Sequence, residues 1–127
     1  MSIKRYGVDD VKGAGFQQLP FARAVEAGGW LYVSGQVPLL NGELVAGNVA
    51  VQARQAIQNL LAILKEAGYR PEHVVRCGVW LDDARDFSAF NAVFREFFGE
   101  HPPARACVKA EMARPEVLVE IMVTAAK

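Results

Sequence analysis

Cysteine and histidine are scarce in this sequence. Its 127 residues contain two of each, namely Cys77, Cys107, His73 and His101. Two cysteines are too few for a disulfide framework, and the four residues lack the paired spacing of a zinc site. Neither a G-x-G-x-x-G motif nor a P-loop motif is present. We therefore expect two reduced thiols, as in cytoplasmic proteins, and neither a metal ion nor a cofactor.

The sequence also lacks long apolar runs and any excess of one sign of charge. No apolar run approaches the ~18 residues of a membrane-spanning helix, and segment 1–10 lacks the apolar core of a signal peptide. Lysine plus arginine and aspartate plus glutamate number 14 each, with no basic stripe of the kind that binds nucleic acid. We expect a cytoplasmic single domain over residues 1–127, without membrane or nucleic-acid partners.

The spacing of apolar residues predicts six strands and two helices. Strands are expected at 3–6, 21–26, 30–36, 73–81, 104–110 and 117–125. One helix is expected between Asn48 and Gly68, a second between Asp86 and Gly99, and a glycine-rich loop at 12–15. The second helix should bury Phe87, Phe90, Phe94 and Phe97. The order β-β-β-α-β-α-β-β predicts an α+β fold, with two helices on one face of a six-stranded mixed sheet.

Two helices cover one face of such a sheet and leave the other face uncovered. The alternating strands nevertheless carry bulky residues on both faces, with Trp30, Tyr32 and Trp80 in one set and Leu31, Val33 and Val79 in the other. A monomer would expose one of these sets, and large exposed apolar patches usually mark an interface. We therefore expect a homo-oligomer whose sheet faces pack together.

Two strands carry a charge where an apolar residue is expected. Arg105 lies in the strand at 104–110, and Glu120 lies in the strand at 117–125. If these strands pair, both side chains could share one cleft. A guanidinium in a cleft suits a carboxylate ligand, because its planar fork makes two parallel hydrogen bonds. The spacing leaves open whether the two residues form a ligand site or a structural salt bridge.

Three further residues invite a functional interpretation. Cys107 lies two residues after Arg105 and is a candidate nucleophile, but without a recognisable histidine base the sequence favours a small buried thiol. Asn91 lies beside the apolar face of the second helix, and we expect it to anchor the backbone of a neighbouring loop rather than a ligand. Ser34 is either a hydrogen-bonding residue at a strand end or part of a pocket, and its spacing does not decide. Cys77 is expected in the core.

Several segments together resemble one known family. They are VSGQVP at 33–38, the helices QARQAIQNLLAIL and DFSAFNAVFREFF, and HPPARACV followed by VEI. They are similar to the RidA family, also called the YjgF family, over nearly the whole chain from Leu19 onward. The resemblance implies a chorismate-mutase-like α+β fold and a homotrimer with ligand sites between subunits. It also implies cofactor-independent hydrolysis of reactive 2-imino acids and enamines, such as 2-aminoacrylate and 2-iminobutanoate, to 2-oxo acids and ammonia.

The resemblance also implies roles for the residues singled out above. Arg105 would clamp the substrate carboxylate, and Glu120 would position or activate the attacking water. Cys107 would contribute mainly through its backbone, while Ser34 and Asn91 would shape or support the site. A C=N bond is already electrophilic, so its hydrolysis needs orientation and proton transfer more than a covalent nucleophile.

One position departs from the family pattern. Members of its best-known branch have Gly-Pro-Tyr before the second strand, whereas this chain has Leu19-Pro20-Phe21 and so lacks the tyrosine hydroxyl. Phe21 still offers an apolar wall, and its presence points to a larger or more apolar imine, or an enamine of the aminomuconate type. Two alternatives remain: an endoribonuclease or translation inhibitor, against which the zero net charge weighs, and a non-catalytic carboxylate-binding or chaperone-like trimer.

Overall fold

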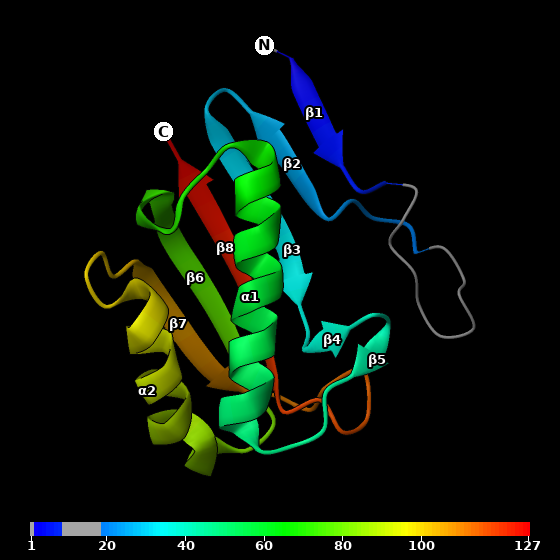
Figure 1. The fold of residues 1–127 in the computed structure, drawn as a ribbon, viewed down its shortest axis with the longest axis vertical. Helices are drawn as coiled ribbons and strands as arrows, with labels where there is room; N and C mark the ends of the chain where they lie inside the picture. Colours follow the sequence, from blue (N-terminus) through cyan, green and yellow to red (C-terminus); the bar gives the residue numbers. More distant parts are fainter. Residues whose placement is uncertain (1, 9–18) are drawn as a thin grey trace.

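The computed structural model describes residues 2–8 and 19–127, so the loop expected at 12–15 lies outside the described residues. Six strands form one sheet in the order β1-β2-β3-β8-β6-β7 (Figure 1). Their bounds are Ile3–Tyr6 (β1), Ala24–Ala27 (β2), Trp30–Gln36 (β3), Val74–Leu81 (β6), Ala104–Lys109 (β7) and Val119–Ala126 (β8). The helices are α1, Val49–Ala67, and α2, Phe87–Phe98, and short 3-10 turns cover Pro71–His73 and Ala84–Asp86.

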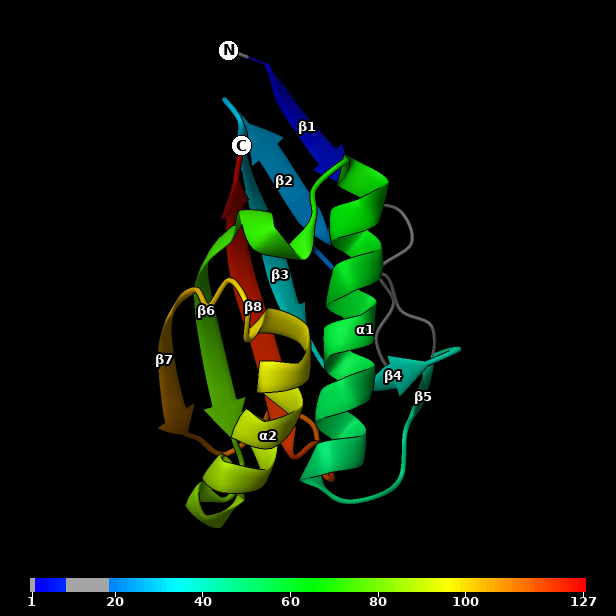
Figure 2. The ribbon, with the colours of Figure 1, turned by 60° about the vertical axis from the view of Figure 1, so that its left-hand side comes forward.

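Both helices lie on the same face of the sheet, as Figure 2 shows from the side. Strands β6 and β7 pair in parallel, while the other neighbouring strands pair antiparallel. A parallel pair needs a crossover connection, and α2 supplies it between β6 and β7. The predicted α+β class, the mixed six-stranded sheet and the placement of both helices are confirmed.

Helix α1 begins and ends where the capping residues predict. The side chain of Asn48 accepts a hydrogen bond of 3.1 Å from the backbone N–H of Val51. Gly68 ends the helix with a φ of 85°, a left-handed conformation that glycine adopts without steric cost. Between them an apolar stripe packs on β3 and β8, with Ala56, Ile57, Leu60 and Leu64 fully buried.

Helix α2 differs in detail from its prediction. It buries Phe90, Phe94 and Phe98. Phe87, expected in the buried face, is 46% exposed, and Phe97 is only partly buried. Asp86 makes no side-chain capping bond, because a 3-10 turn precedes the helix and Asp83 caps that turn by accepting from the N–H of Arg85. The predicted buried face of α2 was therefore wrong at its first residue, Phe87. At the other end Phe98 is the fully buried residue, while Phe97 is buried only in part.

Other boundaries shift by a few residues. The second strand begins at Ala24 rather than at residue 21, and the last begins at Val119 rather than at residue 117. The chain also contains a small hairpin of β4, Leu39–Leu40, and β5, Glu43–Leu44, which is absent from the six predicted strands. Asn41-Gly42, a typical turn sequence, connects its two strands.

A buried glutamine ties α1 to the segment that leads into β8. Gln52 is 2% exposed, although glutamine is usually a surface residue. Its Nε2 donates to the carbonyl of Glu116 at 3.0 Å, and its Oε1 accepts from the N–H of Leu118 at 2.7 Å. Gln52 therefore supplies hydrogen-bond partners to partly buried backbone groups of this segment.

Replacing Gln52 by leucine should destabilise the protein by about 2–3 kcal/mol, because the partly buried hydrogen bonds to the backbone at residues 116 and 118 are lost. Urea unfolding at fixed protein concentration measures this change. Gln58→Leu, an exposed position on the same helix, is the matched control and should change the unfolding free energy by no more than about 0.5 kcal/mol. Equal effects of the two substitutions would contradict the role of Gln52.

Candidate functional site

Arg105 lies on β7 with its side chain directed at α2. Its Nη2 donates a 2.7 Å hydrogen bond to Oδ1 of Asn91. Its Cζ lies 5.8 Å, 5.5 Å and 4.9 Å from the ring centres of Phe87, Phe90 and Phe94. Distances below about 6 Å from a ring face favour a cation. Three aromatic rings and one amide thus hold the guanidinium in a fixed place.

This guanidinium has no carboxylate partner within the described ranges, although other arginines of the chain form salt bridges there. It is only partly exposed and packs against apolar rings. A partly desolvated cation without a counter-charge favours a bound anion. The arrangement suits a carboxylate that approaches the donors of Arg105 not used by Asn91.

The observed partner of Asn91 corrects its predicted role. We expected Asn91 to anchor a loop backbone, but its carbonyl oxygen accepts from Arg105 instead. Asn91 and the three phenylalanines project from the same side of α2, and each phenylalanine lies within about one turn of Asn91. The helix therefore positions Arg105 as a unit.

Glu120 lies on the opposite face of the sheet. Its neighbours Val119 and Ile121 point into the core under the helices, so Glu120 points to the uncovered face. Its partner across the strand pair is Trp80 on β6. Burial raises the pKa of the Glu120 carboxyl above its ordinary value. Among residues 2–8 and 19–127 its carboxylate has neither a hydrogen bond nor a salt bridge.

The expectation that Arg105 and Glu120 share one cleft is wrong for a single chain. Strand β6 lies between β7 and β8, so the two strands do not pair. The two side chains also project from opposite faces of the sheet. The same geometry eliminates the structural salt bridge between Arg105 and Glu120 within one chain.

The two cysteines lie on the helix face of the sheet. Cys77 is 1% exposed, as predicted for a core residue, and burial raises its pKa to about 12. Cys107 is partly buried against the core. Burial also raises the pKa of the Cys107 thiol, which the nearby charge of Arg105 opposes. A thiol with a raised pKa is a poor nucleophile at neutral pH.

Alkylation by iodoacetamide should therefore be slow at both cysteines. At pH 7 we expect Cys107 to react at least about tenfold more slowly than free cysteine, with a rate that rises through pH 9 without a plateau. Mass spectrometry of proteolytic peptides resolves the two sites, with N-acetylcysteine as the reference thiol. A plateau below pH 7 at Cys107 would indicate an activated thiolate and contradict this prediction.

Ser34 and Phe21 lie near each other along the end of β3. The hydroxyl of Ser34 donates to the carbonyl of Ala22 at 2.6 Å, so it acts as a hydrogen bonder at the strand end. Phe21 is 47% exposed and offers an apolar ring to its surroundings. Within one chain, neither side chain has a described contact with Arg105 or Glu120.

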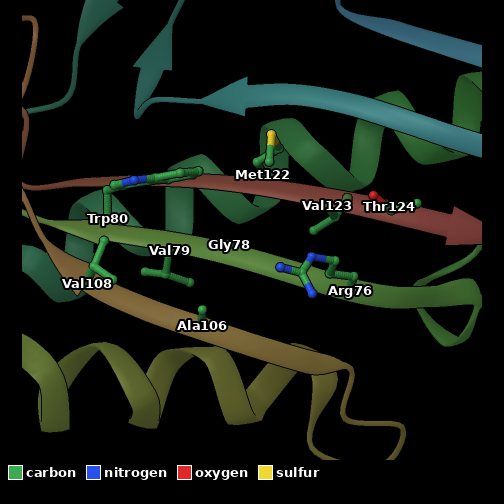
Figure 3. A pocket seen from close by; sticks show the side chains of 9 residues that line it. All are labelled: Arg76, Gly78, Val79, Trp80, Ala106, Val108, Met122, Val123 and Thr124. Atoms are coloured by element: carbon green, nitrogen blue, oxygen red, sulfur yellow. The ribbon is translucent and has the colours of Figure 1, made fainter.

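The uncovered face of the sheet is apolar and hollowed. Its exposed hydrophobic side chains include Trp30, Tyr32, Val108 and Met122. A hollow of about 220 Å³ lies on this face. Figure 3 shows Trp80 and Met122 among the residues that line it, together with Gly78. The exposed apolar set expected from strand alternation is confirmed.

The described part of the chain contains no group of three or more histidine, cysteine, aspartate or glutamate side chains placed to hold a metal ion. No helix in that part is long and apolar enough to cross a membrane.

Comparisons with known proteins agree on one family. The family model described as "Endoribonuclease L-PSP" matches residues 16–127. A RutC family protein of Pyrococcus horikoshii is 40% identical over 110 residues, which cover 85% of this chain and 87% of that protein. The putative regulator AldR of Lactococcus lactis is 40% identical over 108 residues, which cover 84% of this chain and 86% of that protein.

Solved structures show the same fold. A YjgF family member from Neisseria meningitidis is 31% identical with a TM-score of 0.84, and the match covers 100% of this chain and 96% of that one. TdcF of E. coli, solved with bound serine, is 31% identical with a TM-score of 0.83 and 98% coverage of each chain.

Proposed function

Because the chain belongs to the endoribonuclease L-PSP family, which includes the RidA, YjgF and RutC proteins, we propose that it hydrolyses reactive 2-imino acids and their enamine tautomers. The products are 2-oxo acids and ammonia. The observation that carries the proposal is Arg105, a partly buried guanidinium held by Asn91 and aromatic rings but lacking a carboxylate partner within the described ranges. Suitable substrates are 2-aminoacrylate with its imine tautomer 2-iminopropanoate, and 2-iminobutanoate.

Arg105 binds the carboxylate that all these substrates share. Its hydrogen bond to Asn91 uses one donor and leaves others for the ligand. The rings of Phe87 and Phe94 limit the orientation of the guanidinium plane. A fixed guanidinium places the substrate's imine carbon at a constant distance from the clamp, which favours reaction over random encounter with water.

Glu120 handles the water. Its carboxylate accepts a proton as the water oxygen bonds to the imine carbon, and the proton then passes to the imine nitrogen. The resulting carbinolamine loses ammonia when its hydroxyl proton passes through Glu120 to the amine and the C–N bond breaks. The raised pKa of Glu120 suits the first step, because a carboxylate whose pKa lies above its ordinary value is a stronger base towards the attacking water.

Two copies of the chain complete one site in this proposal. Arg105 and Glu120 face opposite sides of one sheet, so the site pairs Arg105 of one copy with Glu120 of another. The apolar uncovered face supplies the packing surface for assembly. The family suggests a homotrimer.

Sedimentation velocity at micromolar concentration should give about three times the 13.9 kDa mass of one chain. Tyr32→Asp should reduce that mass to one chain and remove activity, because it buries a charge in the interface. Val51→Asp is the control: it places the same charge on α1 at 44% exposure, against 52% for Tyr32, and should leave the assembly intact. A wild-type monomer would contradict the shared site.

The assay generates 2-aminoacrylate in situ with a dehydratase and follows its decay by absorbance. The protein should accelerate decay over the dehydratase alone, and heat-denatured protein should not. An unchanged decay rate for 2-aminoacrylate and for 2-iminobutanoate would refute the proposed activity.

A carboxylate-binding role without catalysis is the second candidate. The solved structure of E. coli TdcF with bound serine favours it, since a 2-amino acid offers the same carboxylate to an arginine. Calorimetric binding of serine or 2-oxobutanoate, lost in Arg105→Ala and not accompanied by turnover of any imine, would support this role. RNA cleavage that persists through purification and disappears in Arg105→Ala would favour a ribonuclease instead.

A further inference from the structure

A glycine stands beside Glu120 at a place where the backbone does not require one. Gly35 does not have the left-handed φ that explains glycine at many turns. A Cβ added at this position would lie 2.9 Å from Cδ and 3.3 Å from Cγ of Glu120, and it would overlap Oε2. The Glu120 carboxylate therefore occupies the volume that any other side chain at position 35 would fill.

A β-bulge brings Gly35 to this face. Val33 pairs with Val123 and Gln36 with Ile121, so two residues of β3 oppose one residue of β8. Strict alternation from the buried Val33 would direct position 35 into the core. The extra residue reverses this direction, and position 35 faces the carboxylate on the uncovered side instead. Bulges beside functional sites commonly redirect side chains in this way.

The strand on the other side of Glu120 carries an aromatic residue opposite it. Trp80 is its direct partner across β6, and its large ring is partly buried on the same face. Figure 3 shows the Trp80 ring on this face of the sheet. The Trp80 ring extends over Gly78, whereas the Glu120 carboxylate lies against the backbone of Gly35 on β3.

We propose that Gly35 is a positioning residue, whose missing side chain lets the Glu120 carboxylate stand against β3 where it handles the water. The inference rests on the proposed function, because it assigns Gly35 to the placement of the proposed base. It predicts that position 35 constrains activity more than stability. The overlapping atom is the far end of a flexible side chain, so alanine is accommodated by moving the carboxylate and leaving the strand in place.

Gly35→Ala should lower kcat by about 10- to 100-fold and change KM by less than about threefold, since Arg105 and the substrate carboxylate are untouched. In the Glu120→Gln background the same substitution should cause no further loss, because the group through which Gly35 acts is already gone. Glu120→Asp should restore part of the activity of Gly35→Ala, because the shorter carboxylate leaves room for the methyl group. A crystal structure of Gly35→Ala should show the carboxylate displaced and β3 unmoved.

Four results would overturn the role of Gly35. Two concern the Gly35→Ala variant itself: full activity with a displaced carboxylate, or an unmoved carboxylate with a shifted β3. The third is a loss of activity from Gly35→Ala that adds to the loss from Glu120→Gln. The fourth is unfolding of both Gly35→Ala and the double variant Gly35→Ala with Glu120→Asp. If Gly35→Ala alone fails to fold while the double variant folds, the clash with Glu120 is confirmed as the cause. Wild-type protein without imine turnover would refute the proposed function instead, and the crystal structure would still decide whether Gly35 places the carboxylate.

Discussion

Arg105→Ala is expected to lower kcat/KM for 2-iminobutanoate by about 100- to 10,000-fold. Hydrogen bonds to charged groups contribute about 1.5–3 kcal/mol each, and a clamped carboxylate would lose two of them. Arg105→Lys should retain only a small part of the wild-type kcat/KM. A single ammonium cannot reproduce the planar fork of the guanidinium or its stacking on Phe94. Initial rates over a range of dehydratase-generated substrate measure both effects.

The control for Arg105 is an arginine in similar chemical surroundings but at the surface. Arg54 forms a salt bridge of 2.6 Å to Glu96 and lies 5.9 Å from the ring centre of Phe97. Arg54→Ala should leave kcat/KM within about twofold and the unfolding free energy within about 1 kcal/mol, as for exposed ion pairs. Wild-type activity in Arg105→Ala would show that the substrate carboxylate is bound elsewhere.

Asn91→Ala tests the support of Arg105, and its effect on kcat/KM should lie between those of Arg54→Ala and Arg105→Ala. It removes the acceptor of Arg105 Nη2 and leaves the three ring contacts in place. The guanidinium then gains freedom without losing its charge, so the role assigned to Asn91 is support of Arg105 rather than contact with the substrate.

The local patterns of the sequence were sufficient for most of the fold. The caps at Asn48 and Gly68 bound α1 as predicted, because capping depends on residues adjacent in the chain. Strand alternation correctly separated Leu31 and Val33 from Trp30 and Tyr32. The same reasoning singled out Arg105 and Glu120, since charges at apolar strand positions stand out without any knowledge of strand order.

Strand order and backbone irregularities were beyond the reach of those patterns. Which strands pair depends on contacts between distant segments, and β6 separates β7 from β8. The register pairs Arg105 with Cys77 and Glu120 with Trp80, and these two residues of β6 face opposite sides of the sheet. The bulge that redirects Gly35 depends on register between β3 and β8. The burial of Gln52 also depends on distant contacts, because two of the backbone groups that it bonds, at Glu116 and Leu118, lie more than sixty positions away in the sequence. The one indication in the sequence was its position on the helix, because Gln52 lies beside Ala53 and three residues after Val49, which are both buried.

Glu120→Gln should separate activity from stability. The amide keeps the shape of the side chain but cannot accept a proton, so kcat should fall by about 100- to 10,000-fold while KM changes little. In the wild type, the acid limb of the kcat profile should lie above the ordinary carboxyl pKa of about 4.3, because burial raises the pKa of Glu120 and the reaction needs the ionised form. Rates between pH 4 and pH 9 measure this limb.

Stability should change in the opposite direction. A raised folded pKa means that the folded protein binds this proton more tightly than the unfolded chain does, so the unfolding free energy falls as pH rises through the folded pKa. Glutamine has no charge to bury, so Glu120→Gln should be more stable than wild type at pH 7, and the difference should vanish towards pH 4. Urea unfolding at both pH values measures it, with the exposed Glu43→Gln as control. A variant less stable than wild type at pH 7 would mean that the Glu120 carboxylate contributes to the fold, whereas a gain in stability with a loss of turnover is what a carboxylate retained for catalysis predicts.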